Sequence, residues 1–82
     1  MVSQQIKDFI LKNFLFTDDR SALSDDQSLM QSGILDSTGI LELISFVEET
    51  YGVQVADEEM LPQNFDSVLA ISAFVERKRA AA

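Results

Sequence analysis

Residues 36–52 have the sequence DSTGILELISFVEETYG and contain the signals of one complete amphipathic helix. Asp36 can cap its start, because a carboxylate oxygen accepts hydrogen bonds from the free amides of a first turn. Gly52 is placed to end it, since glycine readily adopts the left-handed conformation that often follows a helix. The apolar residues between these limits recur at helical spacing and form one inward stripe: Ile40, Leu43, Ile44, Val47 and Tyr51. We therefore predict a helix over residues 37–51.

The opposite side of this helix is polar and acidic. Its predicted outward residues are Thr38, Leu41, Glu42, Ser45, Glu48 and Glu49. A leucine among acids suits a docking surface for another protein, whereas a solvated helix face explains any single acid equally well. Both interpretations stay open for each acid taken separately.

The rest of the chain predicts two further helices and one short helical turn. An N-terminal helix over about residues 3–15 has an apolar and a charged face, and the polar residues 17–36 predict a long loop of a kind that is often functional. Acids at residues 57–59 begin a short turn over 57–61 that Pro62 is expected to stop, and Asp66 is expected to cap a last helix over 66–78. The predicted fold class is all-α, with three main helices plus one short helix in a single domain of residues 1–82.

The charge of the chain is high and unevenly spread. Its 82 residues have a formal net charge of −8, and residues 21–76 contain eleven acids and no lysine or arginine. Such a surface repels nucleic acid and anionic lipid and attracts proteins with basic patches. No apolar run is long enough to span a membrane, and the N-terminus does not have the pattern of a secretion signal, so we expect a cytoplasmic protein.

The residue types that are missing exclude several kinds of chemistry. The chain has no cysteine, so it can form neither a disulfide nor a thiolate metal site. It has no histidine, the usual general base and the commonest metal ligand. The acidic pairs at 18–19 and 25–26 lack the spacing and the glycine of a calcium loop, so we predict no metal site. Hydrolytic catalysis is disfavoured, and we expect that the protein is not an enzyme.

Ser37 is the residue on which a functional hypothesis can be built. It opens the central helix directly after the long loop, where free N–H groups and the helix dipole favour negative charge. A phosphate ester on its hydroxyl would therefore be stabilised, and a group attached there would point away from the core. In isolation, an Asp-Ser pair before an apolar run is more often a plain helix cap.

The surrounding pattern resembles the carrier proteins of fatty acid, polyketide and nonribosomal peptide synthesis. Their attachment serine lies in a Gly-x-x-Asp-Ser motif at the start of the second helix, and Gly33, Asp36 and Ser37 match that motif here. The resemblance covers nearly the whole chain. It includes the long loop, the Glu48-Glu49 pair, the acidic turn at 57–59 and the segment Phe65-Asp66-Ser67-Val68.

This resemblance implies a function. A phosphopantetheinyl transferase would move a 4'-phosphopantetheine arm from coenzyme A to Ser37, and the thiol of that arm would carry acyl or aminoacyl groups as thioesters. Asp36 would belong to the transferase's recognition motif. The acidic outer face, together with Asp57 and Glu58, would dock onto basic patches of an acyl- or aminoacyl-activating ligase and of downstream synthase or transferase enzymes. The resemblance further implies a monomer whose cargo can fold back between the helices.

Two positions depart from the commonest form of the family. Thr38 stands where many members have a bulky apolar residue, and Gly39 stands where fatty acid carriers often have an acid. The chain therefore looks closer to free-standing carriers of specialised pathways, including aminoacyl carriers loaded by adenylating ligases.

Two rival hypotheses belong to other classes of protein. The first is a helical interaction module related to carriers but without a prosthetic group. The second is a small enzyme with Ser37 as nucleophile, which without histidine would need Lys7, Lys12 or Lys78 to reach the start of the helix.

Overall fold

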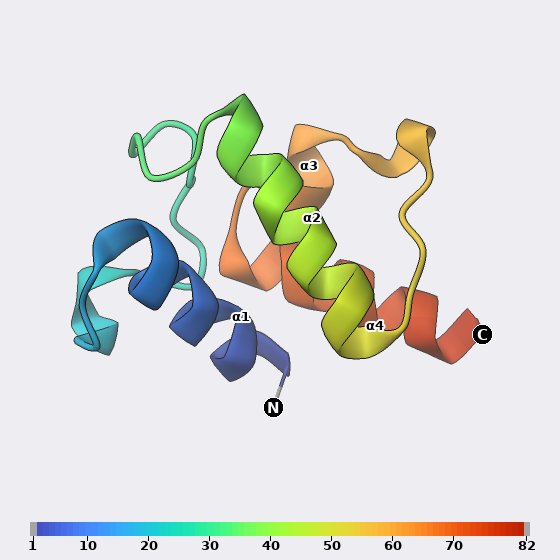
Figure 1. Cartoon of the computed structure of the whole chain (residues 1–82), viewed down its shortest axis with the longest axis horizontal. Coiled ribbons are helices and arrows are strands. Elements are labelled where there is room, and N and C mark those ends of the chain that lie inside the picture. The colour runs from blue at the N-terminus through green and yellow to red at the C-terminus, as the bar shows by residue number, and fades with distance from the viewer. Residues whose placement is uncertain (1, 82) are drawn as a thin grey trace.

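The computed structural model describes residues 2–81, so Met1 and Ala82 of the predicted single domain lie outside the described residues. Helix α4 lies behind α2 and contacts α1, α2 and α3, which gives a small helical bundle (Figure 1). The elements in chain order are α1 (Val2–Ile10), the π-helical turn η1 (Leu11–Leu15), the 3₁₀ turn η2 (Arg20–Ala22), α2 (Ser37–Tyr51), the 3₁₀ turn η3 (Asp57–Glu59), α3 (Pro62–Phe65) and α4 (Val68–Ala81). The all-α fold class is confirmed.

The interior of the bundle is apolar. Among the described residues, sixteen hydrophobic side chains are buried and no polar or charged one is. The most deeply buried come from α1, α2, α4 and the long loop, among them Ile6, Leu29, Leu43, Val68 and Ile71. Burial of this apolar surface is the main term that stabilises the bundle.

Helix α2 begins and ends where the sequence predicts. Asp36 precedes it in an extended conformation, and Gly52 follows it with φ 67°. The first helix also has its predicted extent, although its last turn, η1, is π-helical and ends at Phe16 with φ 55°. A left-handed conformation is unfavourable for a residue with a β-carbon, so Phe16 has a strained backbone.

Two predicted elements differ from the structure. The expected short helix over 57–61 is only the turn η3, and Pro62 begins α3 instead of ending a helix. Proline suits a first helical position, because the amide hydrogen that it lacks has no partner there. The last helix begins at Val68, and its cap is Ser67, whose hydroxyl accepts a hydrogen bond from the Ala70 amide at 3.0 Å. The prediction that Asp66 caps this helix is wrong.

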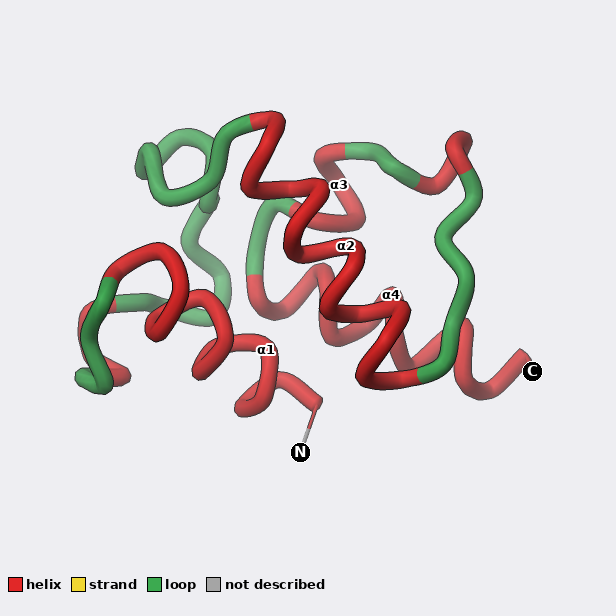
Figure 2. Tube along the Cα trace, viewed as in Figure 1, coloured by secondary structure: helices red, strands yellow, loops and turns green. Residues whose placement is uncertain are grey.

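The long loop between the first and second helices is confirmed, and η2 is its one short helical turn among the described residues (Figure 2). Two ion pairs tie the loop to α1. Lys7 Nζ lies 3.1 Å from Asp25 Oδ1, and Arg20 Nη2 lies 3.0 Å from Asp8 Oδ2. The Arg20–Asp8 pair is solvent-exposed and the Lys7–Asp25 pair is partly exposed, so each contributes about 1 kcal/mol or less to stability. Within residues 2–81, no helix is long and apolar enough to cross a membrane.

Candidate functional site

Ser37 is the first residue of α2 and is exposed to solvent. Asp36 fixes the first turn of α2, which contains Ser37, since the Asp36 Oδ1 atom accepts a hydrogen bond from the Gly39 amide at 2.8 Å. The Asp36 carbonyl accepts a second one from the Ile40 amide at 3.0 Å. The cap leaves the Ser37 hydroxyl itself without a hydrogen bond in the described part of the chain, so it is accessible for a reaction.

The first turn of α2 also has backbone amides without a hydrogen-bond acceptor. The amides of Ser37 and Thr38 donate to no acceptor among the described residues, because no helical turn precedes them. Asp36 accepts only from the two amides that follow. Unpaired amides and the positive end of a helix dipole together favour an anionic group. The residues at this position therefore fit a phosphate ester on Ser37, which is the linkage that a phosphopantetheine arm would make.

Close packing at Gly39 supports the first turn of α2, which contains Ser37. It is buried, and a β-carbon built on it would lie 3.1 Å from Leu35 Cδ2 and 3.1 Å from Phe14 Cε1. Carbon atoms normally approach to about 3.5–4.0 Å, so a larger residue would push these neighbours away. The glycine lets two apolar side chains close directly beneath the helix start. An acid, which fatty acid carriers often have here, would meet this apolar contact.

Phe14 belongs to a row of aromatic rings that joins the first helix to α2. Its ring packs edge-on against Phe9, with centroids 6.0 Å apart, and Phe9 stacks on Phe46 with centroids 4.0 Å apart. Phe46 in turn contacts Tyr51 edge-on at 6.3 Å. Such pairs add stabilisation beyond the burial of their area. The row therefore braces α2 from the turn beneath Ser37 to its C-terminal end.

The structure brings most of the predicted docking residues onto one exposed face of α2. Thr38, Glu42, Ser45 and Glu49 are exposed there, and 58% of the Leu41 surface is accessible. This set with Ser37 is called the α2 outer face below. The face contains two acids and no lysine or arginine, so no basic residue of the face neutralises its negative charge.

Glu48 differs from its neighbours on α2. It is half-buried, and its Oε2 atom accepts a hydrogen bond from the Val55 amide at 2.9 Å. The carboxylate thereby holds the connector that follows α2. The sequence contains no signal for this contact, because Val55 lies beyond the end of the helix. A docking role for Glu48 remains a prediction, but the carboxylate already has a partner within the chain.

Asp57 and Glu58 are exposed on η3. The start of α2 and η3 both lie on the upper edge of the view in Figure 1. Glu59 anchors this turn, because its Oε1 atom accepts hydrogen bonds from the Ala56 amide at 3.0 Å and from Lys78 Nζ at 2.9 Å. The Lys78 ammonium and the Ala56 amide hold the pKa of Glu59 below its usual range.

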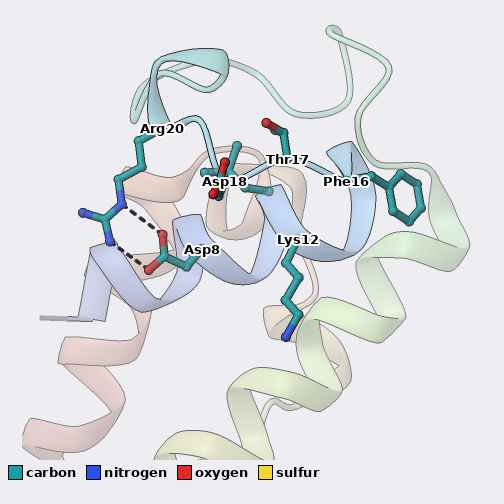
Figure 3. A pocket seen from close by; sticks show the side chains of 7 residues that line it. Asp8, Lys12, Phe16, Thr17, Asp18 and Arg20 are labelled. Atoms are coloured by element: carbon teal, nitrogen blue, oxygen red, sulfur yellow. Dashed lines mark hydrogen bonds and ion pairs between the residues drawn. The ribbon is translucent and has the colours of Figure 1, made fainter.

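The predicted serine–lysine alternative gains no support from these contacts. Lys78 is paired with Glu59 and Lys7 with Asp25, so neither is free to activate Ser37. Lys12 lines an open hollow beside η1 (Figure 3) and a second hollow between the first helix and α2, and Ser37 lines neither of them. Within residues 2–81, no cluster of His, Cys, Asp or Glu side chains could hold a metal ion.

The hollow beside η1 was not anticipated from the sequence. Its lining residues are Asp8, Leu11, Lys12, Phe16, Thr17, Asp18 and Arg20. Arg20 makes two hydrogen bonds to Asp8 on one side, and the Phe16 ring extends outward on the other (Figure 3). Phe16 is 84% exposed, which is unusual for a phenylalanine. None of the lining residues belongs to the predicted attachment site or docking surface.

An exposed, unbonded serine hydroxyl at the start of an acidic helix, in a small helical bundle, fits a protein of the carrier class. The comparisons with known proteins point to the same class. The chain is 28% identical over 80 residues to the probable acyl carrier protein PigG of Serratia sp. (strain ATCC 39006), covering 98% of this chain and 91% of that protein. It is 32% identical over 56 residues to the D-alanyl carrier protein of Abiotrophia defectiva, covering 68% of this chain and 71% of that protein.

The chain belongs to the carrier protein family. Members of this family are not catalysts but work together with partner enzymes. A solved structure described as "Crystal structure of FAD-dependent dehydrogenase" contains a chain with the same fold, with a TM-score of 0.72 and 28% identity over 84% of this chain and 96% of that one. No family model matches the chain.

Proposed function

We propose that Ser37 carries a 4'-phosphopantetheine arm and that the chain shuttles acyl or aminoacyl groups between partner enzymes as thioesters on that arm. The observation that carries this proposal is the exposed, unbonded Ser37 hydroxyl beside two amides without a described acceptor. It lies in a matching Gly-x-x-Asp-Ser motif of a chain that belongs to the carrier family.

Each residue of the site has a distinct task in this proposal. Asp36 holds the turn so that the Ser37 hydroxyl faces solvent, and it forms part of the surface that a phosphopantetheinyl transferase recognises. The amides of Ser37 and Thr38 stabilise the phosphate charge. Once attached, the arm supplies the thiol that this cysteine-free chain lacks.

The α2 outer face, with Asp57 and Glu58, is the proposed docking surface for the partner enzymes. Its excess of negative charge would accelerate encounters with basic patches and leave the complexes short-lived, which suits a shuttle. The partners are a phosphopantetheinyl transferase, an acyl- or aminoacyl-activating ligase and downstream synthase or transferase enzymes. The carrier would act in the cytoplasm as a monomer.

The pathway is proposed from the departures at residues 38 and 39 and from the names of the relatives. One relative is a probable acyl carrier and the other a D-alanyl carrier, so both acyl and aminoacyl cargo have precedent among similar chains. Gly39, which lies close to Phe14 and Leu35, stands where fatty acid carriers often have an acid, and this departure supports a role outside general fatty acid synthesis. We favour a specialised pathway in which an adenylating ligase loads the arm.

One partner of a specific kind is suggested by the solved structure of similar fold. It is described as an FAD-dependent dehydrogenase, and the chain that matches ours is itself of carrier size, since 96% of it is covered. We therefore propose a flavin-dependent dehydrogenase among the enzymes that act on the loaded carrier. Such an enzyme should have its flavin reduced by the acyl-loaded chain and not by the arm-free chain. Equal reduction by both would remove this partner from the proposal.

Intact-mass analysis tests the attachment itself. The purified chain is incubated with coenzyme A and a broad-specificity phosphopantetheinyl transferase, beside Ser37→Ala and Ser24→Ala. Ser24 is a matched control, because it is an exposed serine outside the proposed docking surface. We expect one added phosphopantetheine in the wild type and in Ser24→Ala and none in Ser37→Ala. No addition to the wild type would favour the alternative, a carrier-related interaction module without a prosthetic group.

A further inference from the structure

The segment before Ser37 contains no helix or strand between Leu23 and Asp36, yet it has to hold the start of α2 in place. Leu29 is its centre. The Leu29 side chain is fully buried, and its carbonyl accepts hydrogen bonds from the amides of Ile34 at 2.9 Å and Leu35 at 3.1 Å. The end of the loop is therefore folded back onto Leu29, and its position follows that of Leu29.

Asp66 holds Leu29 and both of its neighbours. The Asp66 carbonyl accepts a hydrogen bond from the Leu29 amide at 2.7 Å. One carboxylate oxygen accepts from the Ser28 hydroxyl at 2.6 Å, and the other accepts from the Met30 amide at 2.9 Å. Three consecutive loop residues thus depend on one residue at the junction of α3 and α4. Figure 2 shows the two segments running side by side.

The carboxylate of Asp66 has no other described partner, because Ser67 caps α4 in its place. The side chain can therefore be changed without removing the cap of α4. Charge-assisted hydrogen bonds of this kind are stronger than neutral ones, which makes the two contacts effective ties. The loop has few others beyond the ion pairs of Asp25 and Arg20 and the hydrogen bond from the Leu69 amide to the Asp25 carbonyl at 2.9 Å.

Two residues connect the loop to the start of α2 and so to Ser37. Leu35 is buried and packs against Gly39 beneath the first turn of α2, and Asp36 caps that turn. We infer that Asp66 is a positioning residue for Ser37: it fixes the Ser28–Met30 segment, which sets Leu35 and Asp36 and so presents the serine hydroxyl for arm attachment. This inference rests on the proposed function in one respect, that the reaction at Ser37 is arm attachment.

The test compares Asp66→Ala, Asp66→Asn and Asp26→Ala with the wild type. Asp26 is a matched control, because it is an exposed acid of the same loop with no described hydrogen bond, and its replacement removes the same charge. Two measurements are made well below the unfolding temperature. The first is kcat and KM for arm attachment by a broad-specificity transferase, with the chain as the varied substrate and coenzyme A in excess. The second is amide hydrogen exchange along the chain.

Asp66→Ala should raise KM by about tenfold and leave kcat nearly unchanged, since loss of the two ties lowers the fraction of chains that present Ser37 correctly. Amide exchange should accelerate over residues 29–36 and stay unchanged in α4. Asp66→Asn keeps an oxygen for the Met30 amide, so its KM should return most of the way to the wild-type value. Asp26→Ala should match the wild type in both measurements.

Several results would overturn the inference. One is an Asp66→Ala variant with wild-type kinetics and wild-type exchange at 29–36. Another is faster exchange throughout α4, which would reveal general destabilisation. If the wild type gains no arm at all, the proposed function fails, and the exchange pattern alone then decides whether Asp66 holds the loop in front of Ser37.

Discussion

Replacing Gly39 with alanine tests the packing beneath Ser37 most directly. Glycine to alanine inside a helix normally stabilises by about 1 kcal/mol, because alanine has the higher helix propensity. Here the new β-carbon would lie 3.1 Å from a Leu35 carbon and 3.1 Å from a Phe14 carbon, short of normal contact on two sides. Overpacking of this kind costs about 1–3 kcal/mol. We therefore expect Gly39→Ala to destabilise the chain by as much as about 2 kcal/mol, or to leave it unchanged where the neighbours relax.

A double-mutant cycle separates the two effects. In a Phe14→Leu background one of the two short contacts is relieved, so Gly39→Ala should be more favourable there by at least about 0.5 kcal/mol, the coupling typical of residues in contact. Urea unfolding followed by far-UV circular dichroism gives the free energies of unfolding, provided that the slope with urea stays constant. The Asp36 cap is kept in every variant, because alanine retains the amide that it binds.

The result that refutes this reasoning is a gain of about 1 kcal/mol from Gly39→Ala in both backgrounds, which is the helix-propensity effect alone. It would mean that Phe14 does not press on the first turn of α2. Gly39→Asp should be worse than Gly39→Ala in either background, because it brings a carboxylate against the buried Leu35 side chain.

Three further predictions concern other parts of the chain. Phe16→Gly should raise the free energy of unfolding by up to about 1 kcal/mol, since it relieves a left-handed backbone and removes a ring that is 84% exposed; a clear loss of stability in urea would contradict this. The pKa of Glu59 is lowered by Lys78, so its stabilising effect is present above the unfolded value near 4.5 and disappears as pH falls through the still lower folded value. The stability difference between wild type and Glu59→Gln should accordingly shrink in acid, and a difference that is constant with pH would argue against the contact. Glu42→Lys and Glu49→Lys should each lower kcat/KM for arm attachment several-fold at low salt, with the differences fading as salt rises; rates equal to wild type at low salt would remove these acids from the docking surface.

The bounds of α2 were predictable from the sequence because its signals are local. Asp36 caps the amide three residues on, and Gly52 adopts its left-handed conformation directly after the last turn. The position of Ser37 follows from the same signals. The apolar stripe from Leu43 to Val47 is buried as predicted, since periodicity alone decides which side of a helix faces the core.

What the sequence does not reveal depends on partners far along the chain. Asp66 has the pattern of a helix cap, but its carboxylate bonds to residues that lie 36 and 38 positions earlier. Glu48 has the pattern of an outward acid, but it accepts a bond from the connector beyond the helix. Pro62 stops a helix or starts one, and which of the two applies depends on where the turn before it ends. Tertiary packing makes these choices, and no local propensity encodes them.

The tie between Asp66 and the loop has a consequence for the order of events during synthesis. Ser37 leaves the ribosome well before Asp66, and the loop has no anchor at the α3–α4 junction until Asp66 has emerged. Small domains fold as units, so the serine would be held in position only when the residues up to and beyond Asp66 are available. Arm attachment would then take place on folded domains, and the transferase would modify a nascent chain that ends before Asp66 poorly, even though its serine is exposed.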